Sequence, residues 1–220
     1  MDTDKIFSNF KTAPWYIKSK EETILLTGVG GIGSNTIMAL GKTIPAKYFI
    51  IDDDIVETHN IGTQAFRESQ IGQTKVQACC DNIDYKNIIG IKKLVKNEYN
   101  PITIMGFDNM KARKLIFDNW KEKEDREILI DGRLRANFYE VFVVTKGRER
   151  KYEKTLFDDN EVDTMPCTYK QTAYFGMLIG ARITHVLCNY LINKYSEEPY
   201  CVVPFKIEEL GDMFFNKLTL

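Results

Sequence analysis

The sequence has little of what marks several protein classes. Its 220 residues include five cysteines, without a Cys-x-x-Cys pair, and two histidines, His59 and His185. A disulfide framework needs paired cysteines, and a structural zinc site needs four Cys or His ligands at suitable spacing. We therefore expect neither disulfides nor zinc.

An excess of charge of one sign is also missing. The chain carries 30 basic and 31 acidic side chains, a formal net charge of -1. Domains that bind nucleic acid usually have a basic excess or a basic stripe. The densest run of charge, residues 146–154, mixes both signs and predicts a solvent-exposed loop. We therefore expect no nucleic-acid partner.

Long apolar runs and an N-terminal signal are lacking as well. The chain begins MDTDKIFSNF, which is polar and acidic, whereas a secretory signal is basic and then apolar. The longest uncharged run in the last predicted helix is residues 171–181, which is shorter than the roughly 20 residues that cross a bilayer. We expect a cytoplasmic protein without a membrane partner.

Apolar segments and turns alternate through the first 132 residues. Strands are predicted at 23–28, 47–52, 88–95, 102–107 and 127–132, and helices at 33–42, 74–84 and 109–123. This rhythm of strand and helix, with continuous apolar strands, is typical of a mostly parallel, doubly wound sheet. The sequence therefore predicts an α/β, Rossmann-like fold.

The pattern changes in the remaining third of the chain. Residues 137–146 alternate between polar and apolar, which predicts an antiparallel strand. Residues 169–195 predict a long helix that is apolar almost all round and therefore buried. The tail, residues 201–218, predicts a hairpin that turns at Gly211 and Asp212.

The length suits one large domain, because domains run to about 100–200 residues. With 44% apolar residues the chain can form a core. We predict a single domain over 1–220. Its parts are an N-terminal docking segment (1–20), a nucleotide-binding core (21–133) and an extension with the antiparallel strands, core helix and hairpin (134–220).

A glycine-rich turn, GVGGIGS, follows the first predicted strand. Gly28, Gly30 and Gly33 satisfy the pattern G-x-G-x-x-G, and Gly31 adds a further glycine. The first glycine permits the tight turn, the second lets the backbone approach a phosphate, and the third lets the helix pack on the strand. The free N–H groups at the helix start attract an anion. Both NAD(H) and ATP fit this turn.

Three aspartates, Asp52, Asp53 and Asp54, end the second predicted strand. In an NAD enzyme one acidic residue near this position binds the ribose hydroxyls, and Asp52 suits that role. Asp54 could cap the following segment or help to organise a metal. We interpret Asp53 as a solvated turn residue.

Further motifs follow in order at residues 55–66, 71–83 and 107–116. Together with the glycine turn and the aspartates they resemble the ThiF/MoeB adenylating family, relatives of the ubiquitin-activating enzymes. The matching positions are Gly28, Gly30, Gly31, Gly33, Ser34, Asp52, Asp54, Val56, Asn60, Gln64, Gly72, Lys75, Asp108, Asn109 and Arg113. The resemblance covers residues 23–133. An NAD-dependent oxidoreductase is the weaker alternative, because it leaves most of these motifs unexplained.

The resemblance implies a reaction. ATP and the C-terminal glycine carboxylate of a ubiquitin-like or sulfur-carrier protein give an acyl-adenylate and pyrophosphate. Because two anions must meet, cations and a metal have to offset their repulsion. The resemblance implies that Lys75 neutralises the phosphates and that Asp108 holds Mg²⁺. It implies polar contacts to the nucleotide from Asn60, Gln64 and Asn109, and it leaves open whether Arg113 is structural.

One residue of the family pattern is missing. The family has an arginine before Gln64, where this chain has Thr63. Loss of such a charge-stabilising group typically lowers the rate by about 10²-fold or more. Either another basic residue substitutes, or the chain is a degenerate relative that binds without adenylating. Candidate substitutes are Arg67, Arg133 and Arg135 of the same chain, and Lys11, Lys18 or Lys20 from a partner subunit, since family members commonly form homodimers.

Many relatives transfer the activated carboxylate to a cysteine. Cys167 is our candidate, because it precedes the long predicted helix and a thiol at a helix N-terminus has a lowered pKa. The alternative is a small residue that packs at the helix start. The other cysteines (Cys79, Cys80, Cys188 and Cys201) are interpreted as packing residues. We expect His59 in an exposed loop and His185 in the core.

Overall fold

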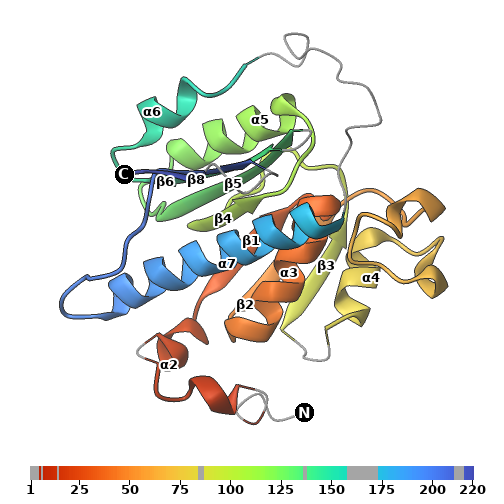
Figure 1. Ribbon diagram of the computed structural model, residues 1–220, viewed down its shortest axis with the longest axis horizontal. Helices are drawn as coiled ribbons and strands as arrows, with labels where there is room; N and C mark the ends of the chain where they lie inside the picture. The colour runs from red at the N-terminus through yellow and green to blue at the C-terminus, as the bar shows by residue number, and fades with distance from the viewer. Residues whose placement is uncertain are drawn as a thin grey trace.

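The computed structural model describes residues 5, 7–13, 15–83, 87–135, 138–157, 173–210 and 216–220. Within them, eight strands form one sheet in the order β3-β2-β1-β4-β5-β6-β7-β8 (Figure 1). The elements, in chain order, are η1 (Ser8–Phe10), α2 (Tyr16–Ser19), β1 (Thr23–Thr27), α3 (Gly31–Thr43), β2 (Lys47–Asp52), η2 (Thr58–Asn60), η3 (Glu68–Gln70), α4 (Lys75–Asp81), β3 (Ile88–Lys92), β4 (Ile102–Met105), α5 (Met110–Lys121), β5 (Ile128–Arg135), β6 (Phe138–Thr145), α6 (Glu149–Glu153), α7 (Ala173–Tyr195), β7 (Lys206–Leu210) and β8 (Asn216–Thr219).

Five strands make the parallel part of the sheet. β1 pairs with β2 on one side and with β4 on the other, β2 pairs with β3, and β4 pairs with β5. The chain runs outward from β1 to β3 and then returns to β4, so the strand order reverses between β1 and β4. Ligands of such sheets bind at the carboxyl ends of the strands at this switch point. The predicted Rossmann-like α/β fold is confirmed.

The antiparallel part continues the same sheet. β6 pairs with β5, β7 with β6, and β8 with β7, all antiparallel. The antiparallel strand predicted at 137–146 and the paired strands of the tail are therefore confirmed. The turn predicted at Gly211 and Asp212 lies outside the described residues.

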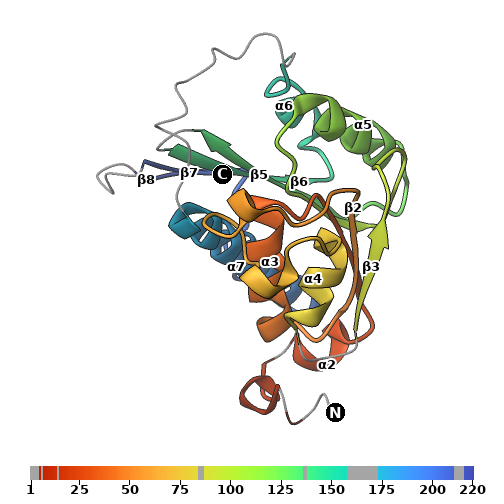
Figure 2. The same cartoon turned by 90° about the vertical axis from the view of Figure 1, so that its right-hand side faces the viewer.

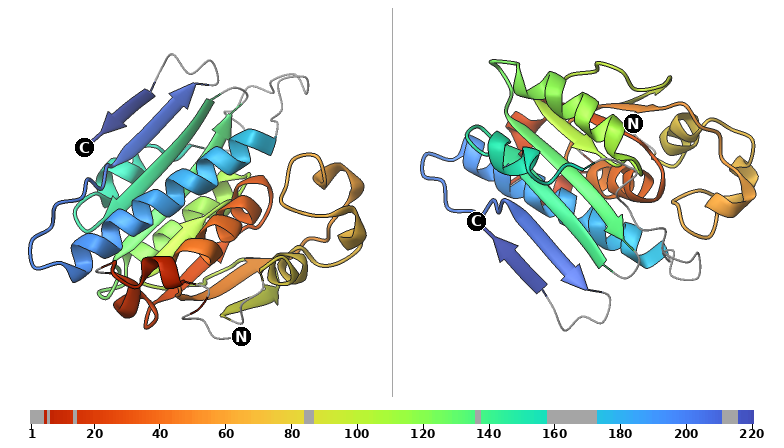
Figure 3. Two further views of the ribbon diagram at one scale, coloured as in Figure 1. Left: turned by 60° about the horizontal axis from the view of Figure 1, so that its bottom comes forward. Right: turned by 90° about the horizontal axis from the view of Figure 1, so that it is seen from above.

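Helices cover both faces of the sheet. α3, α4 and α7 lie on one face, and α5 and α6 lie on the other (Figures 2 and 3). Each face has its own apolar core. The first is built around residues such as Ile24, Ile50 and Ile179, and the second around Phe117 and Trp120. The continuous apolar strands predicted from the sequence follow from this burial on both sides.

The charged run at 146–154 is not the loop that the sequence predicts. It contains α6, whose Tyr152 is fully buried. The Tyr152 ring lies 4.7 Å from that of Phe117 and 5.9 Å from that of Phe142, measured between centroids. The Tyr152 side chain therefore anchors a short helix. The charged residues around it predict a loop instead.

The long helix α7 is not buried all round. Tyr174, Met177 and His185 are exposed, because only one side of α7 packs on α3 and the sheet. The expectation that His185 lies in the core is wrong. The stretch Tyr174–Tyr195 is long and apolar enough to cross a membrane by length and composition, and half of its most apolar window is buried inside the fold.

Two glycines let α7 cross closely over α3. A Cβ on Gly176 would lie 2.6 Å from the carbonyl oxygen of Gly31, and one on Gly180 would lie 2.8 Å from the carbonyl carbon of Asn35. Backbone therefore packs directly against backbone at this crossing. The contact fixes the start of α3, where the glycine turn lies.

This crossing gives a test in which packing and helix propensity oppose each other. Gly180→Ala should lower the free energy of unfolding by about 1–3 kcal/mol, because the added methyl overpacks the crossing. Propensity alone would raise it by about 1 kcal/mol. The measurement is the urea midpoint, with Ala181→Gly at the adjacent exposed position as a control for propensity. A higher midpoint for Gly180→Ala would contradict the close crossing.

Candidate functional site

Close backbone contacts build the glycine turn between β1 and α3. Gly28 has a left-handed φ of 79°. A Cβ on Gly33 would lie 1.9 Å from the Gly28 carbonyl oxygen, and one on Gly106, directly after β4, would lie 2.8 Å from the same oxygen. The Gly106 N–H donates to the Thr27 carbonyl oxygen at 2.8 Å. Gly106 therefore belongs to the turn, although the sequence motif does not include it.

The other two glycines of the motif keep space open. No described atom beyond the immediate chain neighbours lies within 4 Å of a Cβ placed on Gly30, and for Gly31 the nearest is the Thr63 carbonyl oxygen, at 3.8 Å. The first N–H groups of α3 have no partner within the helix. An anion could therefore approach these donors closely at the positive end of α3.

Asp52 fixes the turn against the end of β2. Its Oδ2 accepts from the Val29 N–H at 2.7 Å, and its Oδ1 accepts from the Asp54 N–H at 2.9 Å. Burial raises the pKa of the Asp52 carboxyl above its ordinary value, although the two hydrogen bonds act in the opposite direction. The carboxylate thus already has a structural role. Ribose binding by its remaining lone pairs stays a prediction.

Lys75, the first residue of α4, is buried rather than on the surface. It is 6% exposed, and its Nζ lies 2.8 Å from Oδ2 of the exposed Asp54. Both residues line a hollow of about 130 Å³ together with Ile55, Glu57, His59 and Asn60. A buried ammonium beside an open hollow can bind a phosphate oxygen that enters the hollow. His59 is exposed, as expected.

The three aspartates at the end of β2, of which Asp54 is expected to cap the next segment or to help organise a metal, lie close together. The carboxylates of Asp52, Asp53 and Asp54 have ligand atoms within 4.8 Å of one another. Asp53 and Asp54 are exposed, whereas Asp52 is engaged by the backbone. Exposed acidic groups often gather without an ion, so this cluster alone does not define a metal centre.

The loop that follows is held against the glycine turn. Ser34 Oγ donates to the Gly30 carbonyl oxygen at 2.6 Å and accepts from the Ala65 N–H at 3.0 Å. The buried Asn60 accepts from the Glu57 N–H through Oδ1 at 2.9 Å. These bonds place Thr63, where the family arginine is missing, next to the start of α3.

Gln64 keeps an unused acceptor. Its side-chain Oε1 is buried and has no hydrogen-bond partner in the described part of the chain. A buried carbonyl oxygen without a donor is unfavourable and calls for an explanation. A hydroxyl or amino group of a ligand would satisfy it, which agrees with the predicted polar contact from Gln64.

Asp108 lies at the carboxyl end of β4 and is exposed. The neighbouring Asn109 caps α5, because its Oδ1 accepts from the Ala112 N–H at 2.8 Å. Asn109 Nδ2 lies 3.3 Å from Asp108 Oδ1. The Asp108 carboxylate is therefore open to a metal, while nucleotide binding by Asn109 stays a prediction.

A buried ionic network lies under this edge. Asp131 is fully buried, and its two oxygens accept from Arg113 Nε at 2.8 Å and Arg133 Nε at 2.6 Å. The Tyr152 hydroxyl donates to Asp131 Oδ2 at 2.9 Å. Burial disfavours the charged Arg133, but Asp131 and Tyr152 raise its pKa above the ordinary value. Arg113 is thus a structural residue of the network.

The network excludes Arg133 as the substitute cation. Its remaining N–H groups donate to the backbone and hydroxyl oxygens of Thr155 at 2.8 and 3.1 Å, so the guanidinium is held on the α5–α6 face. Arg67 is exposed. Lys11, Lys18 and Lys20 precede β1 and lie toward the amino edge, so they could act only from a partner subunit. The Arg135 side chain and Cys167 lie outside the described part.

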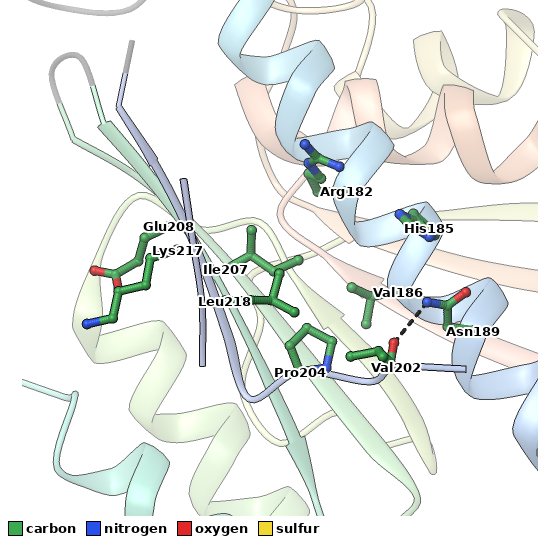
Figure 4. A pocket seen from close by; sticks show the side chains of 10 residues that line it. All are labelled: Arg182, His185, Val186, Asn189, Val202, Pro204, Ile207, Glu208, Lys217 and Leu218. Carbon is green, nitrogen blue, oxygen red and sulfur yellow. Dashed lines mark hydrogen bonds between the residues drawn. The ribbon is translucent and has the colours of Figure 1, made fainter. Parts of the chain in front are cut away.

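A larger hollow lies elsewhere. It measures about 410 Å³ and separates α7 from the β7–β8 pair (Figure 4). Val186, Ile207 and Leu218 face it, and Arg182 and His185 lie along its α7 side. The glycine turn contacts the first turn of α7 instead. Lys75, Asp54 and Asn60 line the smaller hollow.

Comparison with known proteins bears on the family of the chain. The model of the ThiF family matches residues 7–210, almost the whole chain. The chain belongs to the ThiF family. The resemblance seen in the motifs is therefore confirmed, and in this ThiF-family chain it extends beyond the 23–133 region that carries them.

Curated relatives match part of the ThiF-family chain. Ubiquitin-like modifier-activating enzyme 5 of Drosophila willistoni is 33% identical over 94 residues, which cover 43% of this chain and 23% of the relative. Adenylyltransferase and sulfurtransferase MOCS3 of Caenorhabditis briggsae is 33% identical over 79 residues, covering 36% and 19%. The matched regions thus span a quarter or less of these relatives.

Solved structures show the same fold. E. coli MccB with ATP has a TM-score of 0.71 at 15% identity, covering 94% of this chain and 65% of MccB. PaaA has a TM-score of 0.71 at 16% identity, covering 93% and 65%. At such identity the likeness establishes the fold of this ThiF-family chain.

The cysteines of the described part give a test of which thiols are nucleophilic. Burial raises the pKa of Cys79 and Cys80, and it raises that of Cys188 to about 12. At pH 8 iodoacetamide should therefore alkylate Cys79 and Cys188 at least about 100-fold more slowly in the folded protein than in urea, because the thiolate is the reactive form.

Mass spectrometry of peptides after timed labelling measures each rate separately. If Cys167 is the nucleophile predicted from the sequence, it should react faster in the folded protein than in urea. A slower reaction there would support the packing interpretation of Cys167, and fast labelling of Cys79 would contradict its burial.

Proposed function

We propose that this chain is an adenylyltransferase that activates a carboxylate with ATP. The observation that carries the proposal is the meeting, at one edge of the sheet, of an open glycine turn, a buried lysine and an exposed aspartate. ThiF-family membership supports it, as do the names of the relatives, which include an activating enzyme and an adenylyltransferase. MccB, whose fold is similar, has been solved with ATP.

Charge at this edge supports a magnesium requirement. Four carboxylates, those of Asp52, Asp53, Asp54 and Asp108, lie at the carboxyl ends of β2 and β4, and the buried cation beside them, Lys75, is already paired with Asp54. A triphosphate adds further negative charge. A divalent ion with oxygen ligands offsets this repulsion, and Asp108 has a free carboxylate to hold it.

The proposed chemistry uses these residues in distinct roles. The α3 N–H groups and the space at Gly30 and Gly31 bind phosphate, and Lys75 neutralises it. A carboxylate oxygen of the substrate attacks the α-phosphorus, and the bond from that phosphorus to the pyrophosphate oxygen breaks. Acyl-adenylate and pyrophosphate result without a proton transfer. Mg²⁺, when bound, would stabilise the charge on the phosphates.

For the substrate we propose the C-terminal carboxylate of a ubiquitin-like or sulfur-carrier protein, and a homodimer as the acting form. The relatives named as modifier-activating enzyme 5 and MOCS3, and MccB solved with MccA, support a protein or peptide substrate. Thr63 favours a second candidate, a ThiF-family chain that binds ATP without adenylating.

Asp108→Asn tests the site directly. It should lower pyrophosphate exchange into ATP by about 10²-fold or more, because the metal loses a charged ligand. Exchange of labelled pyrophosphate is measured with a panel of carrier proteins ending in glycine. Asp53→Asn, which also removes an exposed carboxylate, should retain exchange, and thermal unfolding should be unchanged in both variants.

The same panel separates the alternatives. Unchanged exchange in Asp108→Asn would place the metal elsewhere. ATP binding by the wild type without exchange, across the panel, would favour the second candidate. Binding of NAD(H) in the absence of ATP binding would reject both candidates in favour of an oxidoreductase.

Thr63→Arg should restore the missing cation. The Thr63 backbone lies beside Gly31, so an arginine there can reach the phosphates and should raise exchange by about 10-fold or more. Thr63→Gln, similar in length and uncharged, is the control and should leave the rate unchanged. An equal rise in both variants would mean that side-chain size, rather than charge, limits the reaction.

A further inference from the structure

Arg113 binds the backbone on both sides of Asp108. Its Nη1 donates to the Asn109 carbonyl oxygen at 3.3 Å, and its Nη2 donates to the Phe107 carbonyl oxygen. Phe107 and Asn109 are the two residues that flank Asp108 in the chain. The guanidinium therefore spans the peptide units that carry the proposed metal ligand.

Contacts to β5 fix the Arg113 guanidinium. Nε donates to Asp131 at 2.8 Å, and Nη2 also donates to the Gly132 carbonyl oxygen at 3.0 Å. Arg113 is 4% exposed, and Asp131 is fully buried. A planar guanidinium between a buried carboxylate and three carbonyl oxygens has little freedom to move. The loop after β4 is thus tied to β5 through one side chain.

Asp108, in contrast, has little that orients its own side chain. It is exposed, and the amide Nδ2 of the adjacent Asn109 approaches its Oδ1 at 3.3 Å. Its direction therefore depends on the backbone on either side, which Arg113 holds. Metal ligands need such supporting contacts, because a small displacement weakens ion binding.

We propose that Arg113 is the positioning residue that sets Asp108 for the metal-bound nucleotide. The inference rests on the proposed function for the identity of that ligand, but the backbone clamp can be tested without it. Arginine is required, because a lysine ammonium could pair with Asp131 but could not reach the carbonyl oxygens of Phe107 and Asn109 at the same time.

The buried network supplies a matched control. Arg133 makes the same kind of Nε contact to Asp131, at 2.6 Å, but its other donors go to Thr155 instead of to the Asp108 loop. Arg113→Lys and Arg133→Lys therefore perturb the same carboxylate. They differ in whether the peptide units beside Asp108 lose their donors.

The first experiment measures amide hydrogen exchange in the protein without ligand. Both variants should lower the melting temperature. Arg113→Lys alone should speed exchange in the peptide covering residues 106–113 by about 10-fold or more, because local opening becomes easier there. Equal exchange of this peptide in the two variants, or no change in Arg113→Lys, would overturn the clamp.

The second experiment uses Mn²⁺ with ATP and follows bound Mn²⁺ by electron paramagnetic resonance. The apparent Kd for Mn²⁺ should rise about 10-fold or more in Arg113→Lys and stay near the wild-type value in Arg133→Lys, as expected for a lost supporting contact. An unchanged Kd in Arg113→Lys would overturn the positioning role even if the loop exchanges faster.

These measurements separate the inference from the proposed function. If the wild type binds Mn²⁺ and ATP but shows no pyrophosphate exchange, adenylation is rejected, and the role of Arg113 is still decided by the two variants. If Arg113→Lys does not fold, Arg113→Met takes its place. Asp131 then keeps Arg133 and the Tyr152 hydroxyl, so no buried carboxylate is left without partners.

Discussion

Backbone contacts at glycine determine the geometry of the carboxyl edge. Gly28, Gly33 and Gly106 bring β1, α3 and β4 together at distances that leave no room for a Cβ, and Gly176 brings α7 against the same turn. Because these contacts are between backbone atoms, side-chain repacking cannot relieve a substitution. The start of α3, its free N–H groups and the loop after β4 are therefore held in one arrangement, on which the proposed phosphate binding depends.

Charge imposes the second constraint. The edge is rich in carboxylates, and three cations near it are already paired: Lys75 with Asp54, and Arg113 and Arg133 with the shared Asp131. The buried cluster of one carboxylate and two guanidiniums carries a net positive charge, and its desolvation is tolerated because each of the three groups is hydrogen-bonded. The guanidiniums act as braces for loops. In the proposed site, the helix terminus, Lys75 and a metal would supply the attraction for a polyphosphate.

Sequence patterns predict the parts of this structure that depend on local order. The alternation of strand and helix predicts the sheet, and ordered motifs predict which residues gather at its edge. They cannot show Gly106 as part of the turn or Arg113 as a brace, because Gly106 contacts β1 and Arg113 is anchored on β5, both of which are distant in sequence. The wrong expectations of a buried His185 and of a loop at residues 146–154 have a related cause. Packing, rather than composition, determines which side of α7 faces outward. Packing also determines that Tyr152 reaches the core.

The loop that carries Thr63 is held in place without the arginine of the family pattern. Ser34, Asn60 and the Ala65 N–H hold this loop against the glycine turn without any contribution from the side chain at 63, so replacing arginine by threonine leaves the frame intact. Within the described residues, Arg133 is bound on the opposite face and the basic residues before β1 lie at the other edge of the sheet. Neither Arg133 nor the basic residues before β1 of the same chain can therefore take the place of the missing arginine in the proposed phosphate site, which leaves the exposed Arg67, a bound metal ion or a second chain among the sources of the completing charge.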